Sequence, residues 1–97
     1  MEAAKVVEKR FVIRSKLGLH ARPAALFVRT ANRFRSDITI QKGQQKVNGK
    51  SIMGVMMLAA GPGSHVTIRI AGPDAVRAMA EIEKLLDNNF GEGDRVS

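Results

Sequence analysis

Hydrophobic and polar residues alternate in three stretches of the chain, which is the pattern of β-strands with one buried face. The stretches are residues 6–14, 37–48 and 64–71. The middle one contains a Lys42-Gly43 turn, which divides it into a hairpin of two strands, 37–41 and 44–48. The pattern therefore predicts four strands. In the first of them, Phe11 and Ile13 share the inward face.

Three other stretches repeat apolar residues at the spacing of a helix. The first begins near Pro23; its apolar residues are at 24, 27, 28, 31 and 34, and Arg22, Arg29 and Arg33 lie opposite. The second runs from residue 52 to about 59 and ends before a Gly-Pro-Gly turn. The third follows Gly72-Pro73-Asp74, where Asp74 complements the helix dipole. Its expected core residues are Val76, Met79, Ile82 and Leu86.

Together these elements predict an α+β domain, in the order strand-helix-strand-strand-helix-strand-helix. We expect one domain over residues 1–97, with an antiparallel sheet covered on one face by helices and with loose termini at 1–5 and 91–97. A chain of 97 residues has room for one core and little room for an interior cavity.

Composition narrows the classes of function. The net charge of +7 and the pI near 10.6 raise the question of nucleic acid. The chain has no Trp or Tyr, however, and its four Phe residues are scattered, so we expect an acidic partner protein instead. The absence of Cys excludes disulfides. No run of 18 apolar residues and no signal-peptide core are present, which predicts a cytoplasmic protein without membrane insertion.

The junction between the first strand and the first helix carries the clearest candidate chemistry. Pro23 suits a first helical turn, which places His20 near the N-cap. The free N–H groups and the dipole of a helix start favour a dianion there, and Arg22 can add charge-assisted hydrogen bonds. An imidazole with an ordinary pKa of about 6.5 is largely neutral and nucleophilic near pH 7. The junction suggests a histidine that accepts a phosphoryl group, although on spacing alone a solvated cap residue remains the simpler interpretation.

The stretch Gly18-Leu19-His20-Ala21-Arg22-Pro23-Ala24 closely resembles the active-site motif of the HPr family, the histidine phosphocarriers of the bacterial phosphoenolpyruvate:sugar phosphotransferase system. Residues 49–58 resemble the regulatory-serine segment of that family at the expected separation. The likeness runs from about Phe11 to the last helix.

This resemblance implies an open-faced β-sandwich of four strands and three helices. It implies that enzyme I phosphorylates His20, through Nδ1, and that the group passes to enzyme IIA components, with Arg22 assisting. The protein would be a monomeric carrier without enzymatic turnover, metal or cofactor. Ser51 stands at the position that an HPr kinase/phosphorylase can phosphorylate in members of this family, where that kinase exists. The docking face would include Ile52, Met53 and Met56.

The composition of the helix after Ser51 also favours a docking role, because residues 52–60 contain no charged or polar side chain. If Val55, Leu58 and Ala59 turn inward, then Met53, Met56 and part of Ile52 remain near the surface, with Met57 beside them. The alternatives stay open: a Met-rich stretch that is simply core, and a Ser51 that is only a helix cap.

Two other features of the sequence could indicate a nucleotide-binding loop or a metal site, and neither fits. Gly49-Lys50-Ser51 lacks the glycine that a nucleotide-binding P-loop needs five residues earlier, because position 44 is Gln. His65 lies in a strand without acidic or Cys neighbours, so we expect an exposed strand histidine, and no residue cluster has metal-ligand spacing.

Two alternatives for the function remain. Leu17 looks like the nitrogen-related branch of the phosphotransferase system, with a mainly regulatory role, whereas residues 51–56 look like the sugar-type branch. A purely regulatory binding protein that docks through the Ser51 helix is the second alternative.

Overall fold

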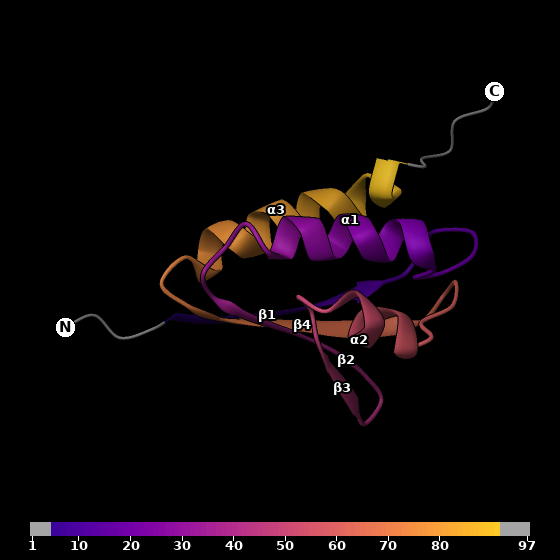
Figure 1. The fold of residues 1–97 in the computed structure, drawn as a ribbon, viewed down its shortest axis with the longest axis horizontal. Helices are drawn as coiled ribbons and strands as arrows, with labels where there is room; N and C mark the ends of the chain where they lie inside the picture. The colour runs from indigo at the N-terminus through magenta and orange to yellow at the C-terminus, as the bar shows by residue number, and fades with distance from the viewer. Residues whose placement is uncertain (1–4, 92–97) are drawn as a thin grey trace.

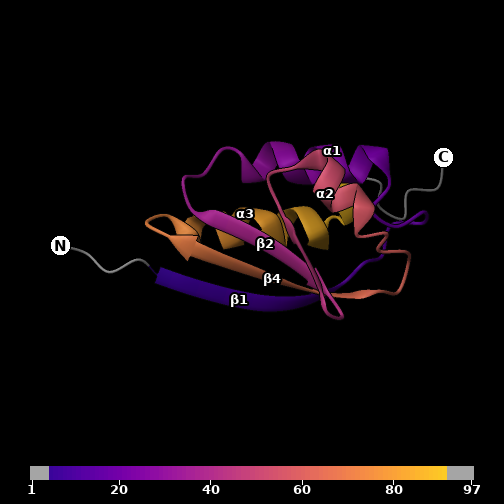
Figure 2. The same cartoon turned by 60° about the horizontal axis from the view of Figure 1, so that its bottom comes forward.

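A computed structural model of the protein describes residues 5–91 as an antiparallel sheet with its helices on one face (Figures 1 and 2). The order is β1 (Lys5–Val12), α1 (Ala21–Ala31), β2 (Asp37–Lys42), β3 (Gln45–Asn48), α2 (Ile52–Met57), β4 (His65–Gly72), α3 (Ala75–Asp87) and a 3-10 turn, η1 (Asn89–Gly91). The predicted α+β open-faced sandwich is confirmed. Within these residues no helix is long and apolar enough to cross a membrane.

The four strands lie in the order β1-β4-β2-β3, and every neighbouring pair is antiparallel. β4 is therefore central, and its register pairs Val66 with Phe11 of β1 and Ile68 with Ile40 of β2. The predicted alternation holds, because the odd-numbered positions of β4 face away from the helices while Val66, Ile68 and Ile70 are almost completely buried.

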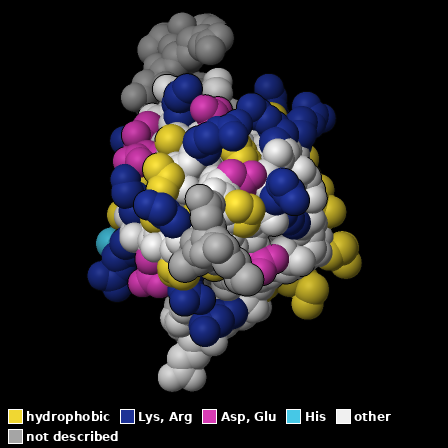
Figure 3. Space-filling model, turned by 90° about the vertical axis from the view of Figure 1, so that its left-hand side faces the viewer, with side chains coloured by type: hydrophobic (Ala, Val, Ile, Leu, Met, Phe, Trp, Pro, Cys, Tyr) yellow, Lys and Arg dark blue, Asp and Glu magenta, His cyan; other side chains and the backbone are white. Residues whose placement is uncertain are grey.

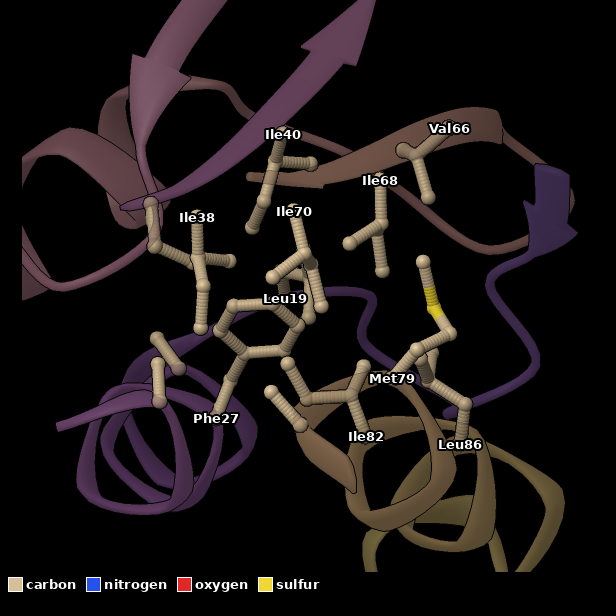
Figure 4. Packing of buried hydrophobic residues seen from close by; sticks show 14 of the residues in the cluster. Leu19, Phe27, Ile38, Ile40, Val66, Ile68, Ile70, Met79, Ile82 and Leu86 are labelled. Atoms are coloured by element: carbon tan, nitrogen blue, oxygen red, sulfur yellow. The ribbon is translucent and has the colours of Figure 1, made fainter. Parts of the chain in front are cut away.

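The core lies between the sheet and the pair α1 and α3, which run side by side over it (Figure 1). Figure 4 shows Phe27 of α1 and Ile82 of α3 pointing toward the isoleucines of β2 and β4. Burial of such side chains stabilises a fold by about 1.5–3 kcal/mol each, so this layer dominates the stability of the domain. It also anchors α1 and thereby positions the residues at its start.

The prediction that Val76 belongs to the core is wrong, because its side chain is 55% exposed. The buried stripe of α3 consists instead of Ala75, Ala78, Met79, Ile82 and Leu86. The small side chains of Ala75 and Ala78 let the first turns lie close to the sheet, and this rotation leaves Val76 on the solvent side.

A second correction concerns Ala59, which was expected to face inward from the second helix. That helix ends at Met57, and Ala59 is exposed in a left-handed conformation with φ of 53°. Val55 and Leu58 are buried, as expected.

Regular structure extends one residue into each terminal segment that was expected to be loose. β1 begins at Lys5, and η1 ends at Gly91. The remaining residues of those segments, 1–4 and 92–97, lie outside the described part of the chain.

Candidate functional site

His20 occupies the N-cap of α1, as predicted, with extended backbone angles (φ −83°, ψ −168°). The carbonyl of His20 accepts the first helical hydrogen bond, from the N–H of Ala24 at 2.9 Å. Pro23, in the first turn, has no N–H to offer, and the amides of Ala21 and Arg22 have no acceptor inside the helix. The helix start thus presents two backbone donors beside a half-buried imidazole.

The loop before His20 is held by a buried serine. The Ser15 hydroxyl, with no exposed surface, donates to the Gly18 carbonyl at 2.8 Å, and the Gly18 N–H donates to the Ser15 carbonyl at 3.0 Å. The N–H of His20 donates to the same Gly18 carbonyl at 2.9 Å. Sequence reasoning missed Ser15, although a serine three residues before a glycine is typical of a side-chain-supported turn.

A second loop, between α2 and β4, lies against the first one at the end of the molecule where α1 begins (Figures 1 and 2). The N–H of Leu19 donates to the Ala60 carbonyl at 2.8 Å. Gly18 has φ of 74°, and a Cβ at this position would overlap the Ala60 carbonyl oxygen and lie 2.6 Å from Gly61 Cα. Gly18 therefore permits both the turn and the close approach of the two loops.

The electrostatic setting of the helix start favours an anion. α1 has no acidic residue in its first turn, and Arg22 is exposed there. Arg14 and Lys16, in the preceding loop, are also exposed, and Arg14 donates to the Asp87 carbonyl at the end of α3 at 3.0 Å. Figure 3 shows that Lys and Arg side chains are also spread over the end of the molecule opposite the start of α1. The positive charge is therefore not confined to the surface around His20.

Ser51 is the N-cap of α2, and its hydroxyl accepts a hydrogen bond from the Gly54 N–H at 3.1 Å. The segment before it is tied to the far end of α1, since Asn32 donates to the Lys50 carbonyl and the Lys50 ammonium donates to the Phe34 carbonyl at 2.7 Å. The 11 residues of α1 span about 16 Å, so His20 and Ser51 lie at opposite ends of this helix. Phosphate on Ser51 would therefore not touch His20.

The hydrogen bond from Lys50 to Phe34 argues against a phosphate-binding loop at Gly49-Lys50-Ser51. The Lys50 ammonium is engaged with a backbone carbonyl, and Gly49 is buried against Ile38 and Phe27. His65 is exposed at the first position of β4, as predicted. In residues 5–91 no group of three or more His, Cys, Asp or Glu side chains could hold a metal ion.

α2 exposes an apolar surface, which we name the α2 patch: Ile52 (42% exposed), Met53 (66%), Met56 (40%) and Met57 (67%). The interpretation of this stretch as simple core is therefore wrong for these four residues. Flexible thioethers on a surface adapt to the shape of a partner, and such patches commonly mark interaction sites.

The chain matches a family model described as the PTS HPr component phosphorylation site, over residues 7–88. The phosphocarrier protein HPr of Treponema pallidum is 47% identical over 87 residues, which span 90% of this chain and 99% of the relative. A crystal structure of HPr from Thermoanaerobacter tengcongensis is 45% identical with a TM-score of 0.86, covering 89% of this chain and 97% of that one.

A third relative is Crh, the catabolite repression protein of Bacillus subtilis. Its crystal structure is 44% identical with a TM-score of 0.69, over 86% of this chain and 95% of that one. That structure is described as an intertwined dimer with a swapped domain. Relatives of this kind are thus not all monomers, and the expected monomeric state of this chain stays a prediction.

Proposed function

The chain belongs to the HPr family of phosphotransferase-system phosphocarriers, and from this premise we propose that His20 receives a phosphoryl group from phospho-enzyme I and passes it to an enzyme IIA. The observation that supports this most directly is the position of His20, at the N-cap of α1 beside the amides of Ala21 and Arg22. The carrier is the substrate of its partners, and we expect it to act in the cytoplasm, where phosphoenolpyruvate is made.

In the proposed step, a ring nitrogen of neutral His20 attacks phosphorus in line. Family resemblance suggests Nδ1 as this nitrogen. A P–N bond forms to His20 while the P–N bond to the donor histidine of enzyme I breaks, and the donor imidazole leaves with the bonding electron pair. The amides of Ala21 and Arg22 and the Arg22 guanidinium stabilise the transferring oxygens. Transfer to enzyme IIA repeats the step with His20 as the donor.

Docking of both partners is assigned to the α2 patch and to the start of α1. The exposed thioethers supply an adaptable apolar contact, and the cations near His20 suit an acidic partner surface. We also propose Ser51 as a site of regulatory phosphorylation by an HPr kinase/phosphorylase. The half-exposed hydroxyl at a helix N-cap supports this, because a phosphate there gains from the helix dipole.

A mainly regulatory carrier of the nitrogen-related branch is the second candidate. Leu17 favours it, since this side chain is 73% exposed in the loop that presents His20 and would meet any partner that docks there. The two candidates differ in partner, so the transfer rate from a sugar-type enzyme I and from a nitrogen-type enzyme I separates them.

The central experiment is incubation with enzyme I and labelled phosphoenolpyruvate, followed by mass-spectrometric location of the label. We expect one acid-labile phosphoryl group on His20, none in His20→Ala and full labelling in the control His65→Ala. Both variants should fold normally, because both histidines lie outside the buried core. Full labelling of His20→Ala at another residue would contradict the proposal.

A further inference from the structure

Lys42, the last residue of β2, reaches across to the end of α2. Its ammonium donates to the Ala59 carbonyl at 2.9 Å and to the Leu58 carbonyl at 3.3 Å. The last carbonyls of a helix accept no hydrogen bond from within the helix, and they lie at the negative end of its dipole. A cation is therefore favourable there. Lys42 thereby fixes the point at which the chain leaves α2.

At that point the backbone is strained. Ala59 has φ of 53°, a left-handed conformation that a residue with a Cβ adopts only when its surroundings hold it there. The Lys42 ammonium is a direct partner of the Ala59 carbonyl, and it is therefore one of the contacts that hold this conformation.

The residue that follows the strained turn contacts the His20 loop. The Ala60 carbonyl accepts the Leu19 N–H at 2.8 Å, and Gly18 packs directly against Ala60 and Gly61. His20 is the next residue after Leu19, and its N–H is bonded to Gly18. An unbroken series of contacts thus leads from the Lys42 ammonium through Ala59, Ala60 and Leu19 to the backbone of His20.

We infer that Lys42 is a positioning residue for phosphoryl transfer at His20. The inference rests on the proposed function of His20. By holding Ala59 in its left-handed conformation, Lys42 sets the place of the Ala60 carbonyl, and this carbonyl in turn sets the backbone that presents the imidazole. Phosphoryl transfer requires an in-line approach, and small misplacements of a reacting group lower its rate steeply.

The alternative is that Lys42 only caps α2. A cap would affect the stability of the domain but not the rate at which folded protein accepts phosphate. The two roles are separated by the maximal transfer rate, by the concentration of carrier at half-maximal rate, and by the hydrogen exchange of the Leu19 amide.

The experiment compares Lys42→Met, Lys42→Arg and a matched control, Lys46→Met, which removes an exposed lysine of the neighbouring strand β3. Phosphoryl transfer from phospho-enzyme I is measured over a range of carrier concentrations, at a temperature where all variants are folded. We expect Lys42→Met to lower the maximal rate about tenfold while the half-maximal concentration changes less than twofold. The Leu19 amide should exchange faster in the same variant.

Lys42→Arg, which keeps a cationic donor, should restore most of the rate, and Lys46→Met should behave as wild type. A wild-type maximal rate in folded Lys42→Met would overturn the inference, and so would an equal loss in Lys46→Met, because that result would indicate only a loss of charge. If Lys42→Met does not fold, Lys42→Gln replaces it. Its side chain is neutral and one atom shorter, so we expect a smaller loss of maximal rate in the same direction, and a wild-type rate would overturn the inference.

The inference and the proposed function fail in different ways. If wild-type protein accepts no phosphoryl group from enzyme I, the proposed function is wrong. Unchanged exchange of the Leu19 amide in Lys42→Met would then still show that Lys42 does not support the His20 loop.

Discussion

Ser36 and Asp74 bind each other reciprocally across the junction of α1, β2 and α3. The Ser36 hydroxyl donates to the Asp74 carboxylate at 2.6 Å and accepts the Asp74 N–H at 3.2 Å. The carboxylate also accepts the N–H groups of Arg35 and Ser36. Asp74 thus joins the start of α3 to the segment before β2, and it caps another segment rather than its own helix.

Because of these hydrogen bonds, the stability of the domain should vary with pH in the acid range. The Ser36 hydroxyl first, and then the Arg35 amide, lower the pKa of Asp74 from 3.8 to about 2. A lowered pKa means that the ionised carboxylate stabilises the fold above pH 3.8, and that this contribution is lost as the pH falls toward 2. We expect Asp74→Asn to be less stable than wild type at pH 7, and the difference to shrink between pH 4 and pH 2. Urea unfolding across this range measures it, and parallel pH profiles of the two proteins would contradict it.

Gly18→Ala should destabilise the domain by about 2–4 kcal/mol, because the added Cβ meets both a positive φ and the backbone of Ala60 and Gly61. Gly43→Ala is the matched control. Gly43 has a similar φ of 60° but open space around it, so a loss of about 1–2 kcal/mol is expected. Denaturant unfolding compares the two, and equal losses would show that the contact between the loops is not tight.

Arg22→Ala should slow phosphoryl transfer to His20 by about ten- to a hundredfold, the range expected for a lost charge-assisted hydrogen bond. Its effect on the free energy of unfolding should stay within about 0.5 kcal/mol, since Arg22 is exposed. Arg29→Ala, an exposed arginine near the other end of α1, is the control and should transfer normally. Rates are measured by rapid quench, and an unchanged rate in Arg22→Ala would mean that the helix start suffices.

Met53→Glu and Met56→Glu should each weaken enzyme I binding about tenfold, because a carboxylate in the α2 patch must be desolvated against the partner. Val76→Glu changes an apolar residue on α3 whose exposure (55%) lies between those of Met53 (66%) and Met56 (40%), and it should bind as wild type. Binding is measured by calorimetry, with thermal unfolding of each variant. Normal binding by both methionine variants would show that enzyme I docks elsewhere.

Much of the architecture can be read from periodicity, because alternation in a strand and the apolar stripe of a helix are local properties. β4 and α1 illustrate this, as their buried positions match the predicted ones, Val28 of α1 being only partly buried. The motif at His20 is also local, since cap, proline and arginine lie within four residues.

What periodicity misses is decided by contacts between distant segments. Lys42 meets Ala59 after 17 residues, and Ser36 meets Asp74 after 38. No local pattern marks either pair, because each depends on which strands become neighbours. The left-handed conformation of Ala59 is also absent from any local pattern, since an alanine does not favour it and its carbonyl is held by the distant Lys42.

Ser51→Asp should leave the fold intact and lower the rate of His20 phosphorylation by enzyme I. A carboxylate suits the N-cap of α2 as well as the hydroxyl does, so stability should change by only a few tenths of a kcal/mol. Because Ser51 and His20 lie at opposite ends of α1, the effect must act on docking and not on the chemistry of the imidazole. The half-maximal carrier concentration should therefore rise more than the maximal rate falls.

Charge at the edge of the α2 patch is the cause we assign to this effect. A true phosphate adds about −1.5 to −2 charges, and aspartate supplies about half of that, so the loss should be partial and should diminish with added salt. Ser51→Asn has the shape of aspartate and also suits an N-cap, but it is neutral, and it should dock as wild type. Transfer is measured for all three proteins at low and high ionic strength. Equal kinetics of Ser51→Asp and Ser51→Asn at low salt would mean that residue 51 acts only as a helix cap.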